Sequence, residues 1–196
     1  MSNTLLNQLI ERLQCLPSVG KKSAQRMAYY LLEHNRSGAI ALSEILSQAM
    51  TDIGNCSKCR DYTEAELCSI CANEKRDPAL LCVVESPSDV VAIESTATYS
   101  GRYFVLMGNL SPLDGIGPDE IGLPKLKQLV EQESCEEVII ATSATVEGEA
   151  TAHYIRSLLD PSINVSRLAQ GVPIGGELGY LDGSTLSLSL ANRQRI

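Results

Sequence analysis

Four of the seven cysteines fall in two closely spaced pairs, and this spacing constrains the fold more than any other feature of the sequence. Cys56 and Cys59 form the first C-x-x-C pair, and Cys68 and Cys71 form the second after eight intervening residues. Each pair can place two thiolates on one tetrahedral ion, so the four together predict a zinc site. A redox-active pair and unrelated thiols are the alternatives. Because four protein ligands leave no position for water, we expect one structural Zn²⁺ per chain.

The other three cysteines, Cys15, Cys82 and Cys135, lie in or beside apolar segments, where we expect them to serve packing. An odd number of cysteines cannot pair completely, and the first residues show neither a basic opening nor a small-residue cleavage site. No stretch reaches the roughly 18 apolar residues of a membrane span. We therefore expect a cytoplasmic protein with reduced thiols and no membrane contact.

Apolar residues recur at helical spacing in three stretches before the first cysteine pair. The stretch at 5–16 predicts an amphipathic helix that ends before Pro17, and 21–33 predicts a second helix after a tight turn. The stretch at 42–53 predicts a third helix, started by the break at 37–38. The first part of the chain is therefore expected to be helical.

The composition changes after residue 77, where continuous apolar runs alternate with helical segments. The runs predict buried strands at 80–84, 103–107, 138–142 and 163–168. Helices are expected between them at 89–95, 123–133 and 147–159. This alternation is typical of a parallel α/β sheet.

These features predict an α/β chain with four parts. The parts are an N-terminal helical domain at 1–54, a four-cysteine zinc module at 55–77, a parallel-sheet domain at 78–170 and a C-terminal segment at 171–196. We expect the C-terminal segment to pack on the sheet domain or on a neighbouring subunit.

The net charge of −8 is concentrated in the C-terminal part of the chain. Residues 1–55 carry five basic and four acidic side chains, whereas 81–196 carry seven basic and fifteen acidic ones. A nucleic-acid contact is therefore expected near the N-terminus, and a basic protein partner at the acidic end. With no Trp and one Phe, the chain has little material for stacking on bases, so we expect contacts mostly to the phosphate backbone.

A basic turn joins the first two predicted helices. The turn contains Gly20 and leaves the free amides of the second helix pointing outward, beside Lys21 and Lys22. Arg26 follows one turn later on the same face. The pattern resembles the helix-hairpin-helix DNA-binding motif, which usually has glycine where this chain has Ser18. We predict that the three basic side chains contact DNA phosphates, with ordinary solvated side chains as the alternative.

A glutamate and a polar segment mark the ends of predicted strands, where open α/β sheets place their functional sites. Glu85 follows the strand at 80–84, and the segment 139–150 resembles the second motif of Toprim domains. In Toprim topoisomerases this motif carries two aspartates, and Ser143 and Thr145 stand in their place here. Because neutral hydroxyls are weak ligands for Mg²⁺, we expect no catalysis.

Two acids of the Toprim segment, Glu147 and Glu149, are retained. Together with Glu85 they are candidates for binding a protein partner, and stabilisation of the helix dipole is the alternative role of the first two. A Toprim nuclease or topoisomerase that uses the three acids with Mg²⁺ is the alternative function. A zinc-stabilised interaction module without DNA contact is a third. The two histidines, His34 and His153, have no obvious catalytic partner.

The helix-hairpin-helix, four-cysteine and acid-depleted Toprim segments, in this order, resemble the RecR family over the whole chain. Matching blocks lie at 20, 22–27, 81–85, 110–118, 145–151 and 171–178. The family usually has Asn-Pro where this chain has Ser143 and Ala144, a departure expected to alter the turn more than the function.

This resemblance implies a non-enzymatic mediator of recombinational DNA repair in bacteria. Such a protein assembles into a homo-oligomeric ring, a dimer or a tetramer, and binds single- and double-stranded DNA without sequence preference. It acts with RecO and RecF to load RecA onto single strands coated by the single-strand-binding protein. It is expected to do so in the cytoplasm, at the nucleoid.

Overall fold

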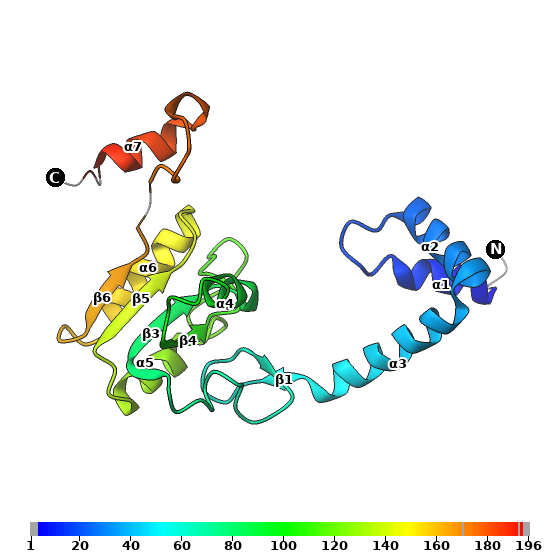
Figure 1. Ribbon diagram of the computed structural model, residues 1–196, viewed down its shortest axis with the longest axis horizontal. Helices are drawn as coiled ribbons and strands as arrows, with labels where there is room; N and C mark the ends of the chain where they lie inside the picture. The colour runs from blue at the N-terminus through cyan, green and yellow to red at the C-terminus, as the bar shows by residue number, and fades with distance from the viewer. Residues whose placement is uncertain (1–3, 170, 192, 194–196) are drawn as a thin grey trace. The chain divides into compact units, whose positions relative to one another are not determined.

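The structure is a computed structural model that describes residues 4–169, 171–191 and 193. The chain divides into two compact units, Met1–Ile53 and Gly54–Ile196 (Figure 1). The first unit is helical. The second contains the paired cysteines, the sheet and the C-terminal segment.

The helical unit consists of α1 (Leu5–Leu13), α2 (Lys21–His34) and α3 (Arg36–Asp52). The predicted start of the third helix is wrong, because α3 begins before the break at 37–38. The Asn35 side chain accepts the Gly38 amide at 3.0 Å and caps α3 there. A Cβ at Gly38 would overlap the Asn35 side chain, so the glycine permits this cap. The first helix also ends earlier than predicted, at Leu13.

Two short strands, β1 (Gly54–Asn55) and β2 (Tyr62–Thr63), pair antiparallel at the start of the second unit. The sheet that follows contains β3 (Asp77–Val84), β4 (Gly101–Val105), β5 (Glu137–Ala141) and β6 (Asn164–Arg167). Its spatial order is β4-β3-β5-β6, and every pairing is parallel. The predicted α/β class is therefore confirmed, and each predicted run overlaps its strand.

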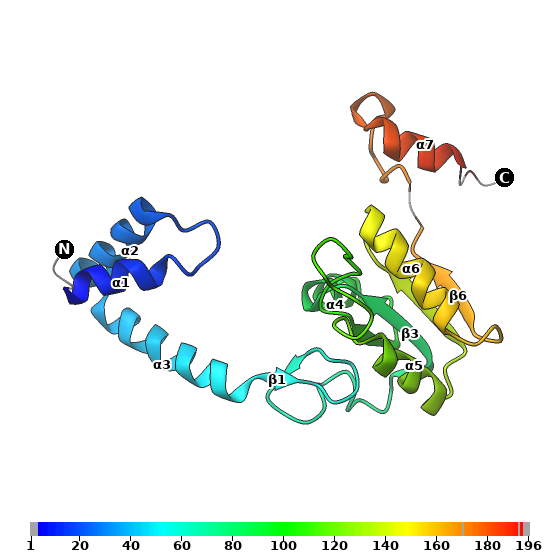
Figure 2. The same ribbon diagram turned by 180° about the vertical axis from the view of Figure 1, so that it is seen from behind.

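Helices cover both faces of the sheet (Figure 1, Figure 2). One face packs against α5 (Leu123–Gln132) and α6 (Val146–Leu158), and the other packs against α4 (Pro87–Glu94). Along β3, Leu81 and Val83 join the core beneath α5 and α6, whereas Cys82 and Val84 join the core beneath α4. Burial on both faces explains why β3 is apolar without alternation.

The described C-terminal segment contains η1 (Leu178–Tyr180) and α7 (Gly183–Ala191), neither of which the sequence predicted. Asp182 starts α7, because its carboxylate accepts the Thr185 amide at 2.9 Å. Leucine and serine alternate at 186–190, which hides the helical period. No described side chain of α7 is buried, and its docking on the sheet or on a neighbouring subunit stays a prediction.

The three unpaired cysteines differ in burial. Cys82 and Cys135 are buried in the sheet unit, as expected for packing residues. Burial raises the pKa of Cys82 to about 12, so its thiol stays neutral. Cys15 is exposed, and its predicted packing role is wrong. Because α1 ends at Leu13, Cys15 falls in the following turn rather than on the apolar face of the helix.

Candidate metal centre and nucleic-acid interface

The four paired cysteines converge on one point. Their Sγ atoms all lie within 4.8 Å of one another, and all four side chains are buried. Around a tetrahedral zinc ion with bonds of ~2.3 Å, neighbouring sulfurs lie roughly 3.8 Å apart. The Sγ atoms of Cys59 and Cys68 are 3.5 Å apart. The donor set and its spacing therefore fit one structural Zn²⁺, held by Cys56, Cys59, Cys68 and Cys71, as predicted.

Backbone amides support the sulfur ligands. The Cys68 amide donates to Cys56 Sγ at 3.3 Å, and the Cys71 amide donates to Cys68 Sγ at 3.4 Å. Burial raises the pKa of Cys56, but backbone hydrogen bonds from Cys59, Cys68 and Lys58 outweigh burial and lower this pKa to about 7. The fold thus favours the thiolate of Cys56, which is the form that binds metal, whereas the hydrogen bond with Cys71 raises the pKa of Cys59 and burial raises that of Cys68.

In the structure the zinc module spans 54–76, from the start of β1 to the residue before β3, and Arg60 joins this module to the sheet. Its backbone is left-handed, with φ 70°, and its guanidinium donates to the carbonyls of Leu106 (3.1 Å), Ile121 and Glu120 (3.4 Å). The guanidinium also lies 5.9 Å from the centroid of the Phe104 ring. Arg60 therefore binds the module to the segment between β4 and α5, a contact that the spacing of the cysteines does not indicate.

A second connection between the module and the sheet runs through Glu133. Its carboxylate contacts Lys58 Nζ at 2.7 Å and Arg102 Nη1 at 2.6 Å, and 18% of its side chain is exposed. Burial alone would raise the pKa of Glu133, but the two cations outweigh burial and lower it. The Cys59 carbonyl accepts the Val105 amide at 2.8 Å. The zinc module is thus hydrogen-bonded along the end of β4.

The turn between α1 and α2 leaves the first amides of α2 open. Ser18 has φ 64°, in the left-handed region that favours glycine, so the serine carries backbone strain here. Gly20 is the N-cap of α2, and no side chain caps this end of the helix. Uncapped amides at a helix N-terminus suit an anion.

Three basic side chains surround these amides. Lys21, Lys22 and Arg26 are exposed, and within the part of the chain that the structure describes none of them forms an ion pair. The first turn of α2 contains no acid. This end of α2 therefore offers uncompensated positive charge and open amides, which is an arrangement suited to phosphate. Contact of these three residues with DNA stays a prediction.

Glu85, at the end of β3, is held by neutral donors. The amide and the hydroxyl of Ser143 both donate to Glu85 Oε1, at 2.9 Å each. Ser143 Oγ also lies 2.9 Å from Thr145 Oγ1. Of the two residues at the aspartate positions of the Toprim motif, Ser143 therefore hydrogen-bonds to the Glu85 carboxylate and Thr145 hydrogen-bonds to Ser143, and neither adds negative charge.

The turn that carries Ser143 is tightly packed. Thr145 is the N-cap of α6 and accepts the Gly148 amide at 3.1 Å. A Cβ at Gly148 would overlap the Ser143 carbonyl oxygen. Glycine therefore allows α6 to approach the turn, and this approach fixes Ser143 beside Glu85.

Glu147 and Glu149 lie in the first turn of α6, where the helix dipole favours acids. Glu149 Oε2 pairs with Arg167 Nη1 at 2.6 Å, a partner that sequence reasoning missed. Within the described residues, the cysteine quartet is the one group of His, Cys, Asp or Glu side chains placed to hold a metal ion. The structure therefore does not gather Glu85, Glu147 and Glu149 into a Mg²⁺ site.

Comparison with family models agrees with these features in chain order. The models matched are the RecR helix-hairpin-helix at 6–50, the RecR four-cysteine zinc finger domain at 53–73, the Toprim domain at 79–169 and the RecR C-terminal model at 171–194. Fold and sites thus define a zinc-binding Toprim protein with a helix-hairpin-helix domain. The chain belongs to the RecR family.

Family membership carries a general functional conclusion. The RecR domains support a recombination mediator role in DNA repair, and the helix-hairpin-helix domain suggests DNA binding. No helix among the described residues has the length and apolar character needed to cross a bilayer. The predicted zinc site, fold class and family are confirmed.

Proposed function

We propose that this protein is a non-enzymatic mediator that binds single- and double-stranded DNA through the turn between α1 and α2. It acts with RecO and RecF to load RecA onto single strands coated by the single-strand-binding protein, in the bacterial cytoplasm at the nucleoid. The observation that carries the proposal is the exposed basic end of α2. There Lys21, Lys22 and Arg26 have no acidic partner among the described residues, beside amides that no side chain caps.

The contact is expected to be to the phosphate backbone. Open helix amides and lysines hold phosphate oxygens without reading base edges, so binding should be independent of sequence. The aromatic residues needed for base stacking are scarce in this chain. Each subunit offers few basic groups to phosphate, so a single copy should bind weakly and lose affinity steeply with salt.

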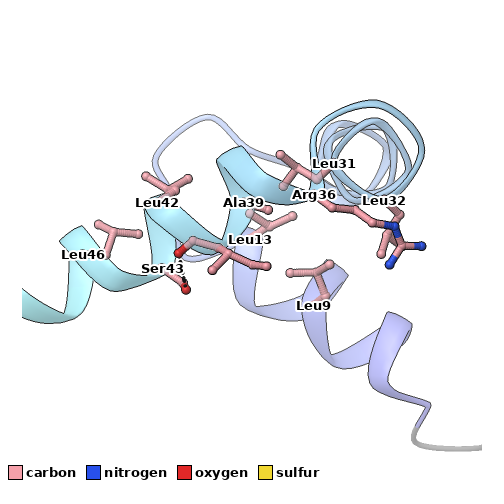
Figure 3. A pocket seen from close by; sticks show the side chains of 10 residues that line it. Leu9, Leu13, Leu31, Leu32, Arg36, Ala39, Leu42, Ser43 and Leu46 are labelled. Atoms are coloured by element: carbon pink, nitrogen blue, oxygen red, sulfur yellow. Dashed lines mark hydrogen bonds between the residues drawn. The ribbon is translucent and has the colours of Figure 1, made fainter.

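Assembly into a ring would overcome this weakness, and the helical unit has a surface suited to assembly. A groove of about 380 Å³ lies among its three helices and is lined mainly by leucines (Figure 3). Along α3, Ile40 is 60% exposed, Ile45 57% and Met50 78%. We propose that a second copy of the chain covers this face in a dimer or a tetramer. Several basic turns held together would raise the effective concentration of each for DNA.

The acids of the Toprim segment support a role without catalysis. Glu85 is engaged by Ser143, and Glu149 pairs with Arg167, so these carboxylates already have protein partners. We propose that Glu85, Glu147 and Glu149 mark the surface that meets a basic protein partner. A Mg²⁺-dependent cleavage or relaxation assay with purified protein separates this proposal from an active Toprim enzyme. Polynucleotide turnover that is lost in Glu85→Gln would overturn it.

The DNA contact is tested by reversing charge at the basic turn. The double variant Lys22→Glu with Arg26→Glu should bind a labelled oligonucleotide at least about tenfold more weakly in a fluorescence anisotropy titration, because two attractions to phosphate become repulsive. Its affinity should also depend less on salt, by about 0.9 in the log–log slope for each phosphate that is no longer neutralised. Lys75→Glu, an exposed lysine of the other unit, is the matched control and should bind as the unaltered protein does.

Zinc content and far-ultraviolet circular dichroism check that the variants are folded. The titration is repeated over protein concentration with and without RecO, which tests assembly and partner dependence together. If the double variant and the unaltered protein bind equally at every salt concentration, the basic turn is not the DNA site.

A further inference from the structure

The edge of the sheet at β6 combines a free strand edge with a cavity. Among the described strands, β6 pairs with β5 alone. The amides of Asn164 and Leu168 donate to carbonyls on the β5 side, at 3.0 and 3.3 Å. Since alternate residues of a strand direct their backbone groups to opposite sides, Val165 and Arg167 direct theirs to the open edge.

The cavity lies between α6 and β6, which run side by side (Figure 1, Figure 2). Its volume is about 330 Å³. The α6 side contributes His153 and Arg156, and the β6 side contributes Val165 and Arg167. Ile140 of β5 adds a further apolar side chain. The cavity therefore has polar basic groups next to an apolar wall, inside a sheet unit that is otherwise acidic.

The guanidinium of Arg167 is only partly used. Its Nη1 pairs with Glu149, but its Nε and Nη2 are buried and have no hydrogen-bond partner among the described residues. Buried donors without acceptors are costly, so this pair of donors points to a ligand. Nε and Nη2 form the side of the guanidinium that binds both oxygens of a carboxylate in parallel.

Arg156 is the other cation that lines the cavity. Arg156 is exposed and forms no ion pair with any residue that the structure describes. His153 lies one helical turn before it and lines the same cavity. A carboxylate seated on Arg167 would therefore have Arg156 and the His153 ring nearby, and the charge of Arg156 would offset repulsion from the Glu149 carboxylate that already pairs with Arg167.

We propose that this cavity binds the carboxylate of an acidic side chain from an extended segment of a partner protein, added as a strand beside β6. Arg167 supplies both halves of the site, because its backbone lies at the open edge and its side chain lines the cavity. A residue opposite it on an added strand would place its side chain next to the guanidinium.

Nucleic acid fits the site less well than a peptide does. The region 81–196 carries fifteen acidic and seven basic side chains, so it repels a chain of phosphates, whereas one carboxylate needs only a local cluster of cations. The apolar wall formed by Ile140 and Val165 suits the aliphatic part of an acidic side chain. A small molecule would leave the free backbone edge of β6 unpaired, whereas the backbone of a peptide can form hydrogen bonds along it.

The site can be tested with a synthetic peptide. The probe is the fluorescein-labelled capped peptide Thr-Val-Glu-Val-Thr, titrated with the zinc-loaded full-length protein and followed by anisotropy. We expect the peptide with Gln in place of Glu to bind about tenfold more weakly, because a neutral amide cannot form the charge-assisted bidentate pair. A version with N-methylated backbone amides should lose affinity to a similar extent, since it cannot add as a strand.

Variants of the chain locate the binding. Arg167→Gln should weaken binding of the Glu peptide about tenfold, and Arg156→Gln, at an exposed position, should weaken it by a smaller factor without affecting the fold. Lys127→Gln on α5 is the matched control and should leave peptide affinity unchanged. All three variants should keep DNA affinity, because the basic turn is intact, so failure of this inference is separable from failure of the proposed function.

Several outcomes would overturn the inference. Equal affinity of the Glu and Gln peptides would show that the cavity does not select a carboxylate. Glutarate that displaces the peptide at the peptide's own affinity would assign the cavity to a small molecule instead. Displacement by a single-stranded oligonucleotide that persists in the Lys22→Glu, Arg26→Glu variant would assign it to nucleic acid. Unchanged binding in both Arg156→Gln and Arg167→Gln would place the peptide elsewhere.

Discussion

The two units of this protein bury their apolar side chains to very different degrees. In the described helical unit only Ala24 and Ala28 are buried, while many large apolar side chains of α3 stay exposed. The sheet unit fully buries large residues such as Phe104, Leu106 and Ile155. Its helices close both faces of the sheet, whereas the three helices of the first unit leave a leucine-lined groove.

The two units therefore obtain their stability from different sources. The helical unit is specified by local signals, such as the caps at Thr4 and Asn35, and by apolar spacing. Large apolar side chains of α3, such as Ile45 and Met50, remain exposed, and contiguous exposed apolar patches often mark interaction sites. The sheet unit is stabilised by its own core and by metal. Substitutions in the sheet unit should therefore change the stability of a single chain. Substitutions on the apolar face of the helical unit should instead change the association between chains.

Removing the metal should have the largest effect, and it should stay in the sheet unit. Cys68→Ser leaves three ligands, so the zinc content should fall well below one ion per chain. Structural zinc sites contribute roughly 10–16 kcal/mol to their modules, more than a loop of this size can replace. Hydrogen exchange should show loss of protection at 54–76 and at the Val105 amide, which the Cys59 carbonyl accepts. Equal loss of protection in α1 and α2 would contradict the conclusion that the two units are stabilised separately.

A matched pair of leucine truncations compares the two units directly. Leu106→Ala, at a side chain with no exposure, should lower the free energy of unfolding by about 2–5 kcal/mol. Leu46→Ala, at a side chain that is 51% exposed, should change this free energy by less than about 1 kcal/mol under conditions where the chain is monomeric. It should instead weaken self-association in analytical ultracentrifugation. Equal unfolding losses in both variants would break the distinction.

Adding a methyl group at one glycine in each unit tests the same difference in packing. Gly148→Ala would overlap the Ser143 carbonyl oxygen, so we expect a loss of about 1–3 kcal/mol in chemical denaturation. Gly20→Ala meets no atom within 4 Å and has φ −82°, so it should cost only about 0.5–1 kcal/mol, because alanine is a poorer N-cap than glycine. If the second variant is the less stable one, the basic turn is packed more tightly than its surroundings indicate.

The smallest effect is expected at Ser18. Because Ser18 has φ 64°, glycine should relieve the strain and stabilise the helical unit by less than about 1 kcal/mol, offset by the greater freedom of glycine in the unfolded chain. Thermal unfolding of the monomer measures this gain. DNA affinity of Ser18→Gly should stay within about twofold, because the lysines are unchanged. A marked drop in stability would mean that the serine side chain has a role of its own in the turn.

Much of this architecture could be predicted from the sequence, because the signals are local. The cysteine spacing determined the ligand set, and the run of apolar residues at 80–84 identified a strand buried on both faces. The start of α3 could not be placed, because Asn35 caps it only if Gly38 lacks a Cβ. The helix α7 was missed because its apolar residues do not follow the helical period.

The contacts that define the sites could not be predicted, because they join residues far apart in the chain. Replacement of the Toprim aspartates was visible at Ser143, but its bonds to Glu85, 58 residues away, depend on the pairing of β3 with β5. The role of Arg167 could not be predicted, because nothing in its sequence neighbourhood marks the ion pair with Glu149. Long-range pairs of this kind follow from the fold rather than from any local pattern.

The hydrogen bonds of Arg60 to the segment between β4 and α5 limit where this chain can be truncated. A fragment that began at residue 78 would keep every strand of the parallel sheet, yet it would leave the carbonyls of Leu106 and Ile121 without their donor and the Phe104 ring without its cover. The zinc module and the Toprim domain are separate segments of the sequence, but they belong to one compact unit of the structure. Truncation experiments should therefore keep the two together. Otherwise, defects that arise from loss of the zinc module would be attributed to the sheet.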